Sequence, residues 1–167
     1  MKTKKLLILI ILSSLTLLMS CDSDDNDLTN IENYLIGGIW KWESSETFYY
    51  YDNEFDRSEI SLNDTDSNKL SFKKDYVVIY ESPLLITELN GNWELSEDES
   101  YLFTDLSYTS GSTSGYGTIY FFPQCKIIEI NKNNMLLESM HDTYTYWSSE
   151  TGNIKVTSFE RSRYIKE

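Results

Sequence analysis

The run Gly37-Gly38-Ile39-Trp40-Lys41-Trp42-Glu43, continued by Ser44-Ser45-Glu46-Thr47-Phe48-Tyr49-Tyr50-Tyr51, decides the fold class. Successive side chains of a β-strand point to opposite faces, so Trp40 and Trp42 share one face while Lys41 and Glu43 share the other. A strand with one apolar and one polar face is typical of an antiparallel sheet that contacts water on one side. We therefore predict a strand over residues 39–51.

Comparable β-rich runs recur along the chain at intervals of about ten residues, with polar turn clusters between them. The predicted strands cover residues 39–51, 69–73, 76–81, 92–96, 101–107, 116–122, 126–131, 135–141, 143–148 and 154–165. Turn residues join several of them, at 74–75, 90–91, 97–99, 131–134 and 150–153. Closing such sequential hairpins into a barrel removes the exposed sheet edges. The sequence predicts an all-β fold, an antiparallel up-and-down β-barrel of about eight strands, with a two-sheet sandwich as the alternative.

A short helical turn is predicted immediately before the first strand. Thr29-Asn30-Ile31-Glu32 fits a capping box, in which a threonine at the N-cap is followed three residues later by glutamate. The turn should run through Tyr34 or Leu35 and end at the glycine pair. With this turn, residues 30–167 are long enough for one domain and too short for two of ordinary size.

The first twenty residues have the layout of a secretory signal peptide. Three lysines precede an apolar run over residues 6–18, which two serines and one threonine interrupt. A membrane-spanning helix needs about 20 predominantly apolar residues, and this run is shorter and leads into an acidic segment. We predict that residues 1–20 are removed; an uncleaved anchor helix is the alternative.

The end of this segment, Leu18-Met19-Ser20-Cys21, resembles the lipobox of bacterial lipoproteins. The resemblance implies that the Cys21 thiol takes a diacylglycerol, that the chain is cut just before it, and that the new amino terminus is acylated as well. Two or more acyl chains anchor a protein stably, whereas one chain binds a membrane only marginally. We therefore expect the membrane to be the partner of this protein through the lipid on Cys21.

An acidic tether is predicted over residues 21–29, between the anchor and the barrel. Within it, Ser23-Asp24-Asp25 resembles the export signal that sends some lipoproteins of Gram-negative bacteria to the cell surface. This resemblance implies an outer-membrane protein that faces the outside of the cell. An orientation toward the periplasm is the alternative, since an acidic block can also be a plain disordered linker.

Net charge excludes a nucleic-acid partner. Removing residues 1–20 takes away three lysines and no acidic residue, which leaves 11 basic against 27 acidic residues and a net charge of −16. Nucleic-acid-binding proteins need a basic surface to neutralise phosphates, and adhesion to anionic headgroups needs clusters of Lys and Arg. The lipid should therefore make the membrane contact by itself.

Gly38-Ile39-Trp40, which opens the first strand after a helical turn, resembles the Gly-x-Trp with which lipocalins begin their barrel. Over residues 30–167 the chain is similar to the lipocalin-like domains of bacterial surface lipoproteins. In lipocalins an arginine from the end of the barrel covers the early tryptophan through a cation–π contact. The resemblance therefore implies a barrel closure made by Gly38, Trp40 and either Arg161 or Arg163, and it implies no specific ligand-binding residue.

We predict no catalytic residues, no metal site and no cofactor. His141 is the only histidine and should lie at a surface turn, which leaves no His-centred triad or zinc site. Cys125 would be a buried, inert thiol, and with Cys21 lipidated it has no partner for an internal disulfide. Residues 64–68 begin like a calcium loop but continue with Lys69 where the loop needs glycine.

Two further patterns are interpreted as structural. Residues 111–115 resemble a nucleophile elbow in spacing, but Thr113 stands at the centre, so residues 107–117 are interpreted as a flexible hairpin tip at the rim of the barrel. Glu129 and Glu138 could in principle form the carboxylate pair of a glycosidase. So many surface acids surround them that no pair stands out.

The 13 tyrosines suggest what such a barrel could bind. Rings with hydroxyl tips suit a small apolar or amphipathic ligand at a barrel mouth, although aromatic residues also simply pack in sheets. We therefore expect a non-enzymatic, lipid-anchored envelope protein that binds such a ligand. The alternative is a protein-interaction or structural module, which a barrel packed with Trp, Phe and Tyr would favour.

Overall fold

A computed structural model describes residues 29–62, 68–85, 88–112, 115–150 and 152–167 of the chain. Its only α-helix in these ranges is α2, Asn30–Ile36. The strands are β1 Ile39–Tyr51, β2 Glu54–Leu62, β3 Lys69–Phe72, β4 Val77–Glu81, β5 Leu89–Leu95, β6 Tyr101–Thr104, β7 Ser107–Ser112, β8 Gly115–Tyr120, β9 Gln124–Ile130, β10 Asn134–Ser139, β11 Asp142–Ser148 and β12 Gly152–Lys166. The predicted signal peptide, Cys21, the first eight residues of the tether and most of the possible calcium loop lie outside these ranges.

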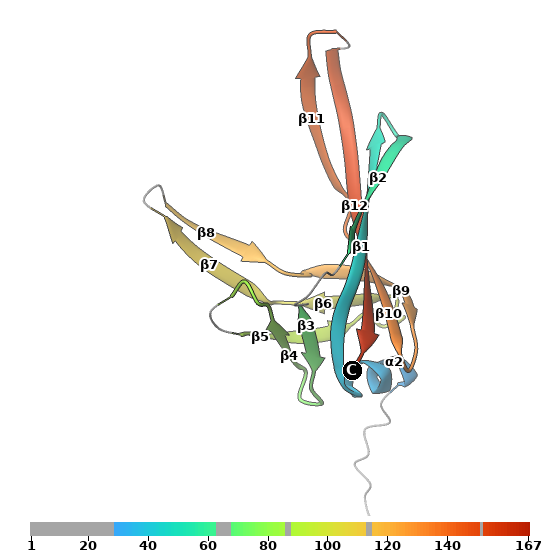
Figure 1. The fold of residues 1–167 in the computed structure, drawn as a ribbon, viewed down its shortest axis with the longest axis vertical. Helices are drawn as coiled ribbons and strands as arrows, with labels where there is room; N and C mark the ends of the chain where they lie inside the picture. The colour runs from blue at the N-terminus through green and yellow to red at the C-terminus, as the bar shows by residue number, and fades with distance from the viewer. Residues whose placement is uncertain (1–28, 63–67, 86–87, 113–114, 151) are drawn as a thin grey trace, which may run out of the picture.

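Eight of the strands close into an antiparallel barrel in the order β1-β3-β4-β5-β6-β9-β10-β12, and β12 pairs back onto β1 (Figure 1). The order follows the chain apart from three insertions: β2, the β7–β8 hairpin and β11. This confirms the predicted all-β class and the up-and-down barrel of about eight strands. The barrel is consistent with a lipocalin-like fold.

The capping box predicted before β1 is present. The Glu32 backbone N–H donates to Thr29 Oγ1 at 3.2 Å, and the Thr29 backbone N–H donates to Glu32 Oε2 at 3.0 Å. These bonds satisfy two N–H groups that a helix end would otherwise leave unpaired. The helix ends at Ile36 with Gly37 as its C-cap, so α2 extends one or two residues beyond the predicted end at Tyr34 or Leu35.

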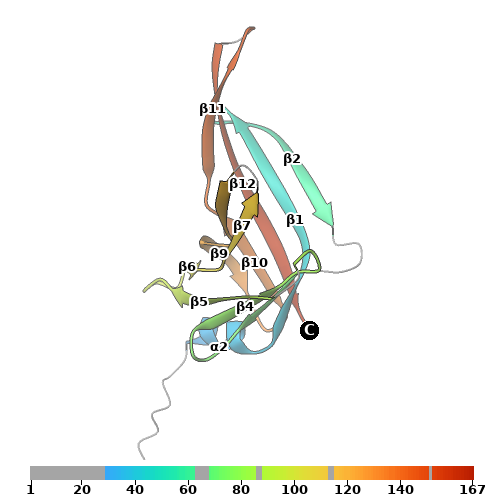
Figure 2. The same ribbon diagram turned by 90° about the vertical axis from the view of Figure 1, so that its left-hand side faces the viewer.

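Two strands are longer than the barrel needs. The first three residues of β1 pair with β3, whereas from Ser44 onward β1 pairs with β2. Likewise β12 pairs with β10 near its end and with β11 over residues 152–158. Since β1 and β12 stay paired with each other from Trp40 to Tyr51, a four-stranded sheet in the order β2-β1-β12-β11 continues beyond the barrel wall. We call it the projecting sheet; Figures 1 and 2 show it rising from the end of the barrel opposite α2.

Three sequence-based assignments were wrong. Residues 107–117 were interpreted as a flexible hairpin tip, yet most of them belong to the paired strands β7 and β8. Residues 54–62 were not predicted to be a strand, yet they form β2. The dipeptide Asn90-Gly91 was predicted to be a hairpin turn, yet it lies inside β5. The glycine serves a close approach there: a Cβ at Gly91 would lie 2.6 Å from Asp105 Oδ1 and 3.0 Å from the Leu106 nitrogen.

The core lies inside the barrel. The inward-facing residues of the eight strands, together with residues from α2 and the β6–β7 connection, form one buried cluster: Leu35, Trp40, Leu70, Phe72, Val78, Tyr80, Trp93, Leu102, Leu106, Cys125, Met135, Leu137 and Tyr164. An eight-stranded barrel encloses a space that side chains can fill completely. Here five large aromatic rings occupy much of that space.

Candidate functional site

The end of the barrel at which β1 begins is closed by α2. Leu35 of this helix is fully buried, and Trp40 Nε1 donates a hydrogen bond to the Leu35 carbonyl at 2.9 Å. Trp40 is itself fully buried, so the indole N–H has the partner that burial requires. The tryptophan of the Gly-x-Trp motif therefore links α2 to the end of the barrel that this helix closes.

Lys166, the last residue of β12, covers Trp40. Its Nζ lies 4.5 Å from the centre of the Trp40 ring and donates to the Tyr34 carbonyl at 2.6 Å. Partial burial lowers the pKa of this lysine, because desolvation disfavours the charged form. The glycine pair makes room for it: a Cβ at Gly37 would lie 2.6 Å from Lys166 Nζ, and one at Gly38 would lie 3.3 Å from Lys166 Cγ.

The expectation that Arg161 or Arg163 covers Trp40 is corrected by this contact. Along β12 the inward-facing residues include Ser162 and Tyr164. The adjacent odd-numbered residues, Arg161 and Arg163, therefore point to the outside. Arg161 Nε instead binds Glu138 Oε2 at 2.8 Å, and Arg163 Nε lies 4.0 Å from Glu43 Oε2. The alternation that places Tyr164 inside also places Lys166 inside, and this signal was present in the sequence.

The opposite end of the barrel, where β6 ends and β9 begins, holds Phe121 and Phe122. Both are partly buried against the core, with ring centres 5.1 and 6.0 Å from that of Tyr80. Thr104 Oγ1 lies 2.8 Å from the Phe121 carbonyl and 3.0 Å from the Phe122 carbonyl, which holds the segment in place. Side chains therefore pack both ends of the barrel and the space between them.

The outer face of the projecting sheet carries a cluster of rings and charges. The Phe159 ring stacks on Phe48 at 4.9 Å and on His141 at 4.4 Å between ring centres. The Arg161 guanidinium lies 5.0 Å from the centre of the Phe48 ring, which suits a cation–π contact. Beside this cluster is an open hollow of about 320 Å³, to which Tyr50 and Glu138 also contribute.

His141 lies in the connection between β10 and β11, with half of its side chain exposed, as the surface-turn interpretation expects. Its Nε2 lies 3.6 Å from Glu138 Oε1, and the same carboxylate binds Arg161 through its other oxygen. Glu138 thus lies between the Arg161 guanidinium and the His141 ring on the sheet surface. Glu129 lies on β9 and accepts a hydrogen bond from Asn131 Nδ2 at 2.8 Å.

The inner face of the projecting sheet is rich in tyrosine. Val156 is fully buried on this face, where Tyr51 and Tyr144 lie opposite it on the neighbouring strands. Arg57 of β2 stacks over the Tyr49 ring at 4.5 Å and donates to Tyr51 Oη at 3.2 Å. The hydrogen bond to Tyr51, together with those to Glu59 and Asp56, raises the pKa of Arg57 above its ordinary value, so this guanidinium stays charged.

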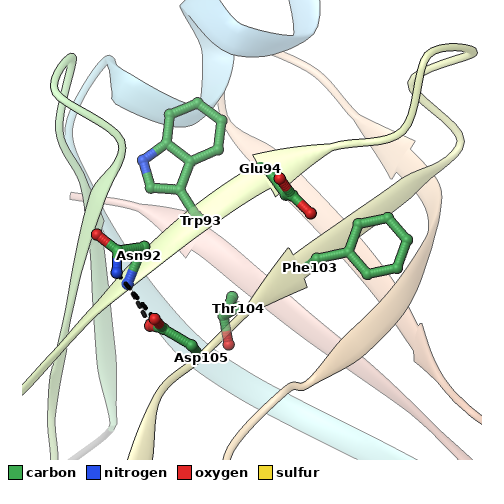
Figure 3. Close-up of a pocket in the computed structure, with 6 residues that line it drawn as sticks. All are labelled: Asn92, Trp93, Glu94, Phe103, Thr104 and Asp105. Carbon is green, nitrogen blue, oxygen red and sulfur yellow. Dashed lines mark hydrogen bonds between the residues drawn. The ribbon is translucent and has the colours of Figure 1, made fainter.

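Another hollow, of about 300 Å³, lies between β5 and β6 (Figure 3). Asn92 and Asp105 lie at one end of it, and Asp105 accepts hydrogen bonds from both the Asn92 backbone and side-chain N–H groups. These bonds lower the pKa of Asp105, so the carboxylate is ionised and bound to its neighbour. The two hydrogen bonds between Asn92 and Asp105 fasten the end of β6 to β5.

The remaining candidates for chemistry have structural surroundings. Burial raises the pKa of the Cys125 thiol to about 12, so it is not a nucleophile near neutral pH. Over the described ranges, no group of three or more His, Cys, Asp or Glu side chains is arranged to hold a metal ion. In the same ranges, no helix has the length and apolar character needed to cross a membrane.

Most of the sites considered from the sequence do not converge. His141, Glu138 and Arg161 meet on the outer face of the projecting sheet, whereas Glu129 and Cys125 lie on β9 and Arg163 pairs with Glu43. Sequence reasoning missed the sheet itself, although Asp52-Asn53 directly after a 13-residue run is a strong hairpin signal. Both residues adopt the positive φ angles, 50° and 72°, that such a two-residue turn requires.

Comparison of the chain with protein-family models, with curated proteins and with solved structures finds no match. Its function is therefore argued from its own residues.

Proposed function

We propose that this protein is a lipid-anchored, non-enzymatic component of the bacterial cell envelope whose barrel is a rigid scaffold and whose projecting sheet binds other proteins. The observation that carries the proposal is the contrast between the two halves of the molecule. The barrel is packed with side chains and closed at both ends, whereas the projecting sheet exposes apolar side chains on strands that extend into solvent.

The packed interior of the barrel favours a scaffold role for the barrel and argues against a ligand-binding calyx. Ligand pockets are concave, mostly apolar and usually formed before the ligand arrives. In this barrel Trp40, Phe72, Tyr80, Trp93 and Tyr164 take up the interior that a ligand would need. The inward-facing Tyr80 and Tyr164 are part of the core, so these tyrosines support packing.

The projecting sheet carries a concentration of exposed apolar side chains. On β2 these are Phe55, Ile60 and Leu62, and on β11 they are Tyr144, Tyr146 and Trp147. Scattered exposed apolar residues are ordinary, but three on each edge strand of one sheet favour an interaction site. Tyr and Trp are also the residues that protein interfaces favour.

The anchor is proposed from Leu18-Met19-Ser20-Cys21 and the apolar run before it. Labelling with a radioactive fatty acid in a Gram-negative host should mark the full chain, and Cys21→Ala should abolish the label and release the protein from the membrane fraction. A labelled or membrane-bound Cys21→Ala variant would refute the anchor.

Exposure at the cell surface is proposed from Ser23-Asp24-Asp25. Protease added to intact cells should digest the protein, while a periplasmic control protein stays intact. Ser23→Ala combined with Asp24→Ala and Asp25→Ala should protect it. Protection of the unchanged protein in intact cells would indicate the periplasmic orientation instead.

The binding surface can be tested with a photo-crosslinking amino acid placed at single positions of the full chain in its membrane. Ile60 and Trp147 represent the projecting sheet, and Glu94 and Glu129 are exposed control positions on the barrel wall. We expect discrete protein adducts from the sheet positions and none from the barrel positions. Equal yields from both regions, or adducts from the barrel alone, would contradict the proposal.

A small apolar or amphipathic ligand is the second candidate, favoured by the hollow beside Tyr50 and Phe159 on the outer face. Its volume of about 320 Å³ is at the lower end of the range for ligand sites. Native mass spectrometry of the protein extracted from its host would show a bound mass that Phe159→Ala removes. An unliganded mass in every preparation would exclude this candidate.

A further inference from the structure

β11 is an edge strand with one side available for pairing. Among the described strands it pairs with β12 alone, and the pairing runs without a break from Asp142 opposite Ser158 to Ser148 opposite Gly152. Its side chains are exposed on both faces of the sheet from Asp142 to Trp147. An edge strand with uninterrupted pairing on its other side presents a row of N–H and C=O groups to any strand that can align with it.

The other edge of the same sheet is built differently. β2 carries four charged residues, Glu54, Asp56, Arg57 and Glu59, and its pairing with β1 is interrupted by a bulge. Charges and bulges are the devices by which natural sheets prevent edge-to-edge pairing. β11 has only Asp142, at its very start, and no interruption, so it lacks the protection that β2 has.

We propose that β11 pairs in antiparallel fashion with β11 of a second copy of the chain, around a two-fold axis at Thr145. The two projecting sheets would then form one continuous eight-stranded sheet. The inference rests on the proposed role of the projecting sheet as a protein-binding element and names its partner.

The strand is complementary to itself in this register. A two-fold axis at Thr145 places Asp142 opposite Ser148, Thr143 opposite Trp147, and Tyr144 opposite Tyr146, each pair occurring twice. Opposed residues of an antiparallel pair lie on the same face, so the tyrosines form two aromatic pairs on the inner face. All seven residues of β11 are used.

Neighbouring registers are worse for stated reasons. An axis at Tyr146 would bring Asp142 opposite Glu150, which sets like charges against each other. An axis at Tyr144 would shorten the pairing within β11. It would also place Trp147 opposite His141, which lies outside the strand. Only the Thr145 axis keeps the single charged residue of the strand opposite a neutral one while pairing the whole strand.

Charge also distinguishes a second copy from a basic partner. The chain carries a formal net charge of −13, so two copies repel each other over long range and salt should strengthen the dimer by screening that repulsion. A partner recruited by charge complementarity would instead be weakened by salt.

Disulfide trapping tests the register directly. The experiment uses the full chain in detergent with Cys21→Ser, in which Cys125 is buried and Thr145→Cys supplies the exposed thiol. Opposed Cα atoms lie about 4.5–5.5 Å apart, within the span of a disulfide, so mild oxidation should convert Thr145→Cys to a covalent dimer. Thr143→Cys is the matched control, because its two copies would lie about 14 Å apart and should stay monomeric. Mixing Thr143→Cys with Trp147→Cys should give the mixed dimer.

Association without a disulfide gives the second measurement. In sedimentation velocity, the unchanged chain should dimerise more strongly as salt rises. Thr145→Lys, which sets two lysines against each other at the axis, should weaken the dimer at least tenfold. Ser61→Lys on the protected edge, β2, should leave it unchanged. Circular dichroism identifies any variant that has lost its fold. If Thr145→Lys has lost it, Thr145→Cys trapping in the Cys21→Ser chain decides the question.

Two outcomes would overturn the dimer: equal trapping of Thr143→Cys and Thr145→Cys, or a monomer at every salt concentration. If the sheet positions still photo-crosslink to other proteins in the membrane, only this inference fails and the proposed binding role stands. If those adducts are missing as well, both fail.

Discussion

At Gly91 the backbone of β5 passes so close to Asp105 that no side chain fits. The same contact lets the Asn92 backbone and side chain bind the Asp105 carboxylate, which joins the end of β6 to β5. The absence of a Cβ at Gly91 therefore allows β5 and the end of β6 to lie close enough for these hydrogen bonds. Nearby, Thr104 binds the segment that carries Phe121 and Phe122. Individual residues with such a role should be sensitive to small changes.

We predict that Gly91→Ala lowers the free energy of unfolding by about 1–3 kcal/mol, because the added methyl must displace Asp105 or the Leu106 backbone. Urea denaturation followed by tryptophan fluorescence measures the change. Asn90→Ala, an exposed neighbour on the same strand, is the control and should change stability by less than about 0.5 kcal/mol. Equal effects of the two substitutions would contradict the close approach.

Asp98 gives a prediction for pH dependence. Hydrogen bonds from the Ser96 and Ser100 hydroxyls and the Ser100 backbone lower the pKa of this carboxyl group to about 2. A carboxyl group with a lowered folded-state pKa stabilises the fold above its ordinary pKa near 4, and this contribution is lost as the pH falls toward 2.

The urea concentration at the unfolding midpoint should therefore decrease as the pH is lowered from about 4 to about 2. Asp98→Asn should make this decrease less steep. Glu97→Gln removes a carboxylate of the same turn that does not take part in these hydrogen bonds, and its profile should follow that of the unchanged protein. Identical slopes for Asp98→Asn and the unchanged protein would show that the turn does not contribute.

At the scale of the element, the projecting sheet depends on two hairpins that extend β1 and β12. The β1–β2 hairpin is formed by Asp52 and Asn53, both with positive φ. Asp52 also connects to β12, since its N–H donates to the Lys155 carbonyl at 2.8 Å and its Oδ1 accepts from the Lys155 N–H at 3.1 Å. The turn therefore fixes the end of three neighbouring strands.

We predict that Asn53→Val destabilises β2, because the left-handed conformation costs an L-residue about 1–2 kcal/mol and asparagine tolerates it better than a β-branched residue. Hydrogen exchange of the β2 amides should become about tenfold faster, while that of β4 in the barrel stays the same. Asn53→Gly keeps the turn conformation and should leave β2 protected. Faster exchange throughout the molecule would show that the sheet and barrel unfold together.

At the scale of the whole molecule, the barrel has the architecture of a container but is filled. Residues from α2, all eight barrel strands and the β6–β7 connection contribute to a single core. Phe121 and Phe122 pack against that core at one end, while Lys166, Trp40 and α2 close the other. The projecting sheet exposes apolar side chains on β2 and β11, which is why the proposed binding role is assigned to it.

Because the core is filled with side chains, we predict that truncating one buried side chain creates a cavity. Leu102→Ala, at a site 1% exposed, should lower the free energy of unfolding by about 2–5 kcal/mol and leave an apolar cavity. Such a cavity should bind a small apolar probe such as benzene or xenon, detected by a rise in melting temperature, whereas the unchanged protein shows no rise. A rise for the unchanged protein would reveal a cavity already present and would favour the ligand-binding candidate.

The sequence by itself determined the elements whose signals are local. Alternating Trp40-Lys41-Trp42-Glu43 predicts β1, Thr29 with Glu32 predicts the start of α2, and the recurrence of turns predicts an up-and-down barrel, because side-chain alternation and capping act over a few residues. The strand β2 escaped prediction because nearly all of its side chains are exposed, so burial imposes no alternation on it.

Only the tertiary structure decided what depends on register between distant strands. Because Trp40 pairs with Lys166, this lysine lies over the Trp40 ring at the α2 end of the barrel, and neither Arg161 nor Arg163 does. The extra length over which β1 and β12 stay paired creates the projecting sheet, and with it the edge at β11. Pairings between residues more than a hundred positions apart follow from closing and packing the whole barrel, because a shift by one residue would turn every side chain to the opposite face.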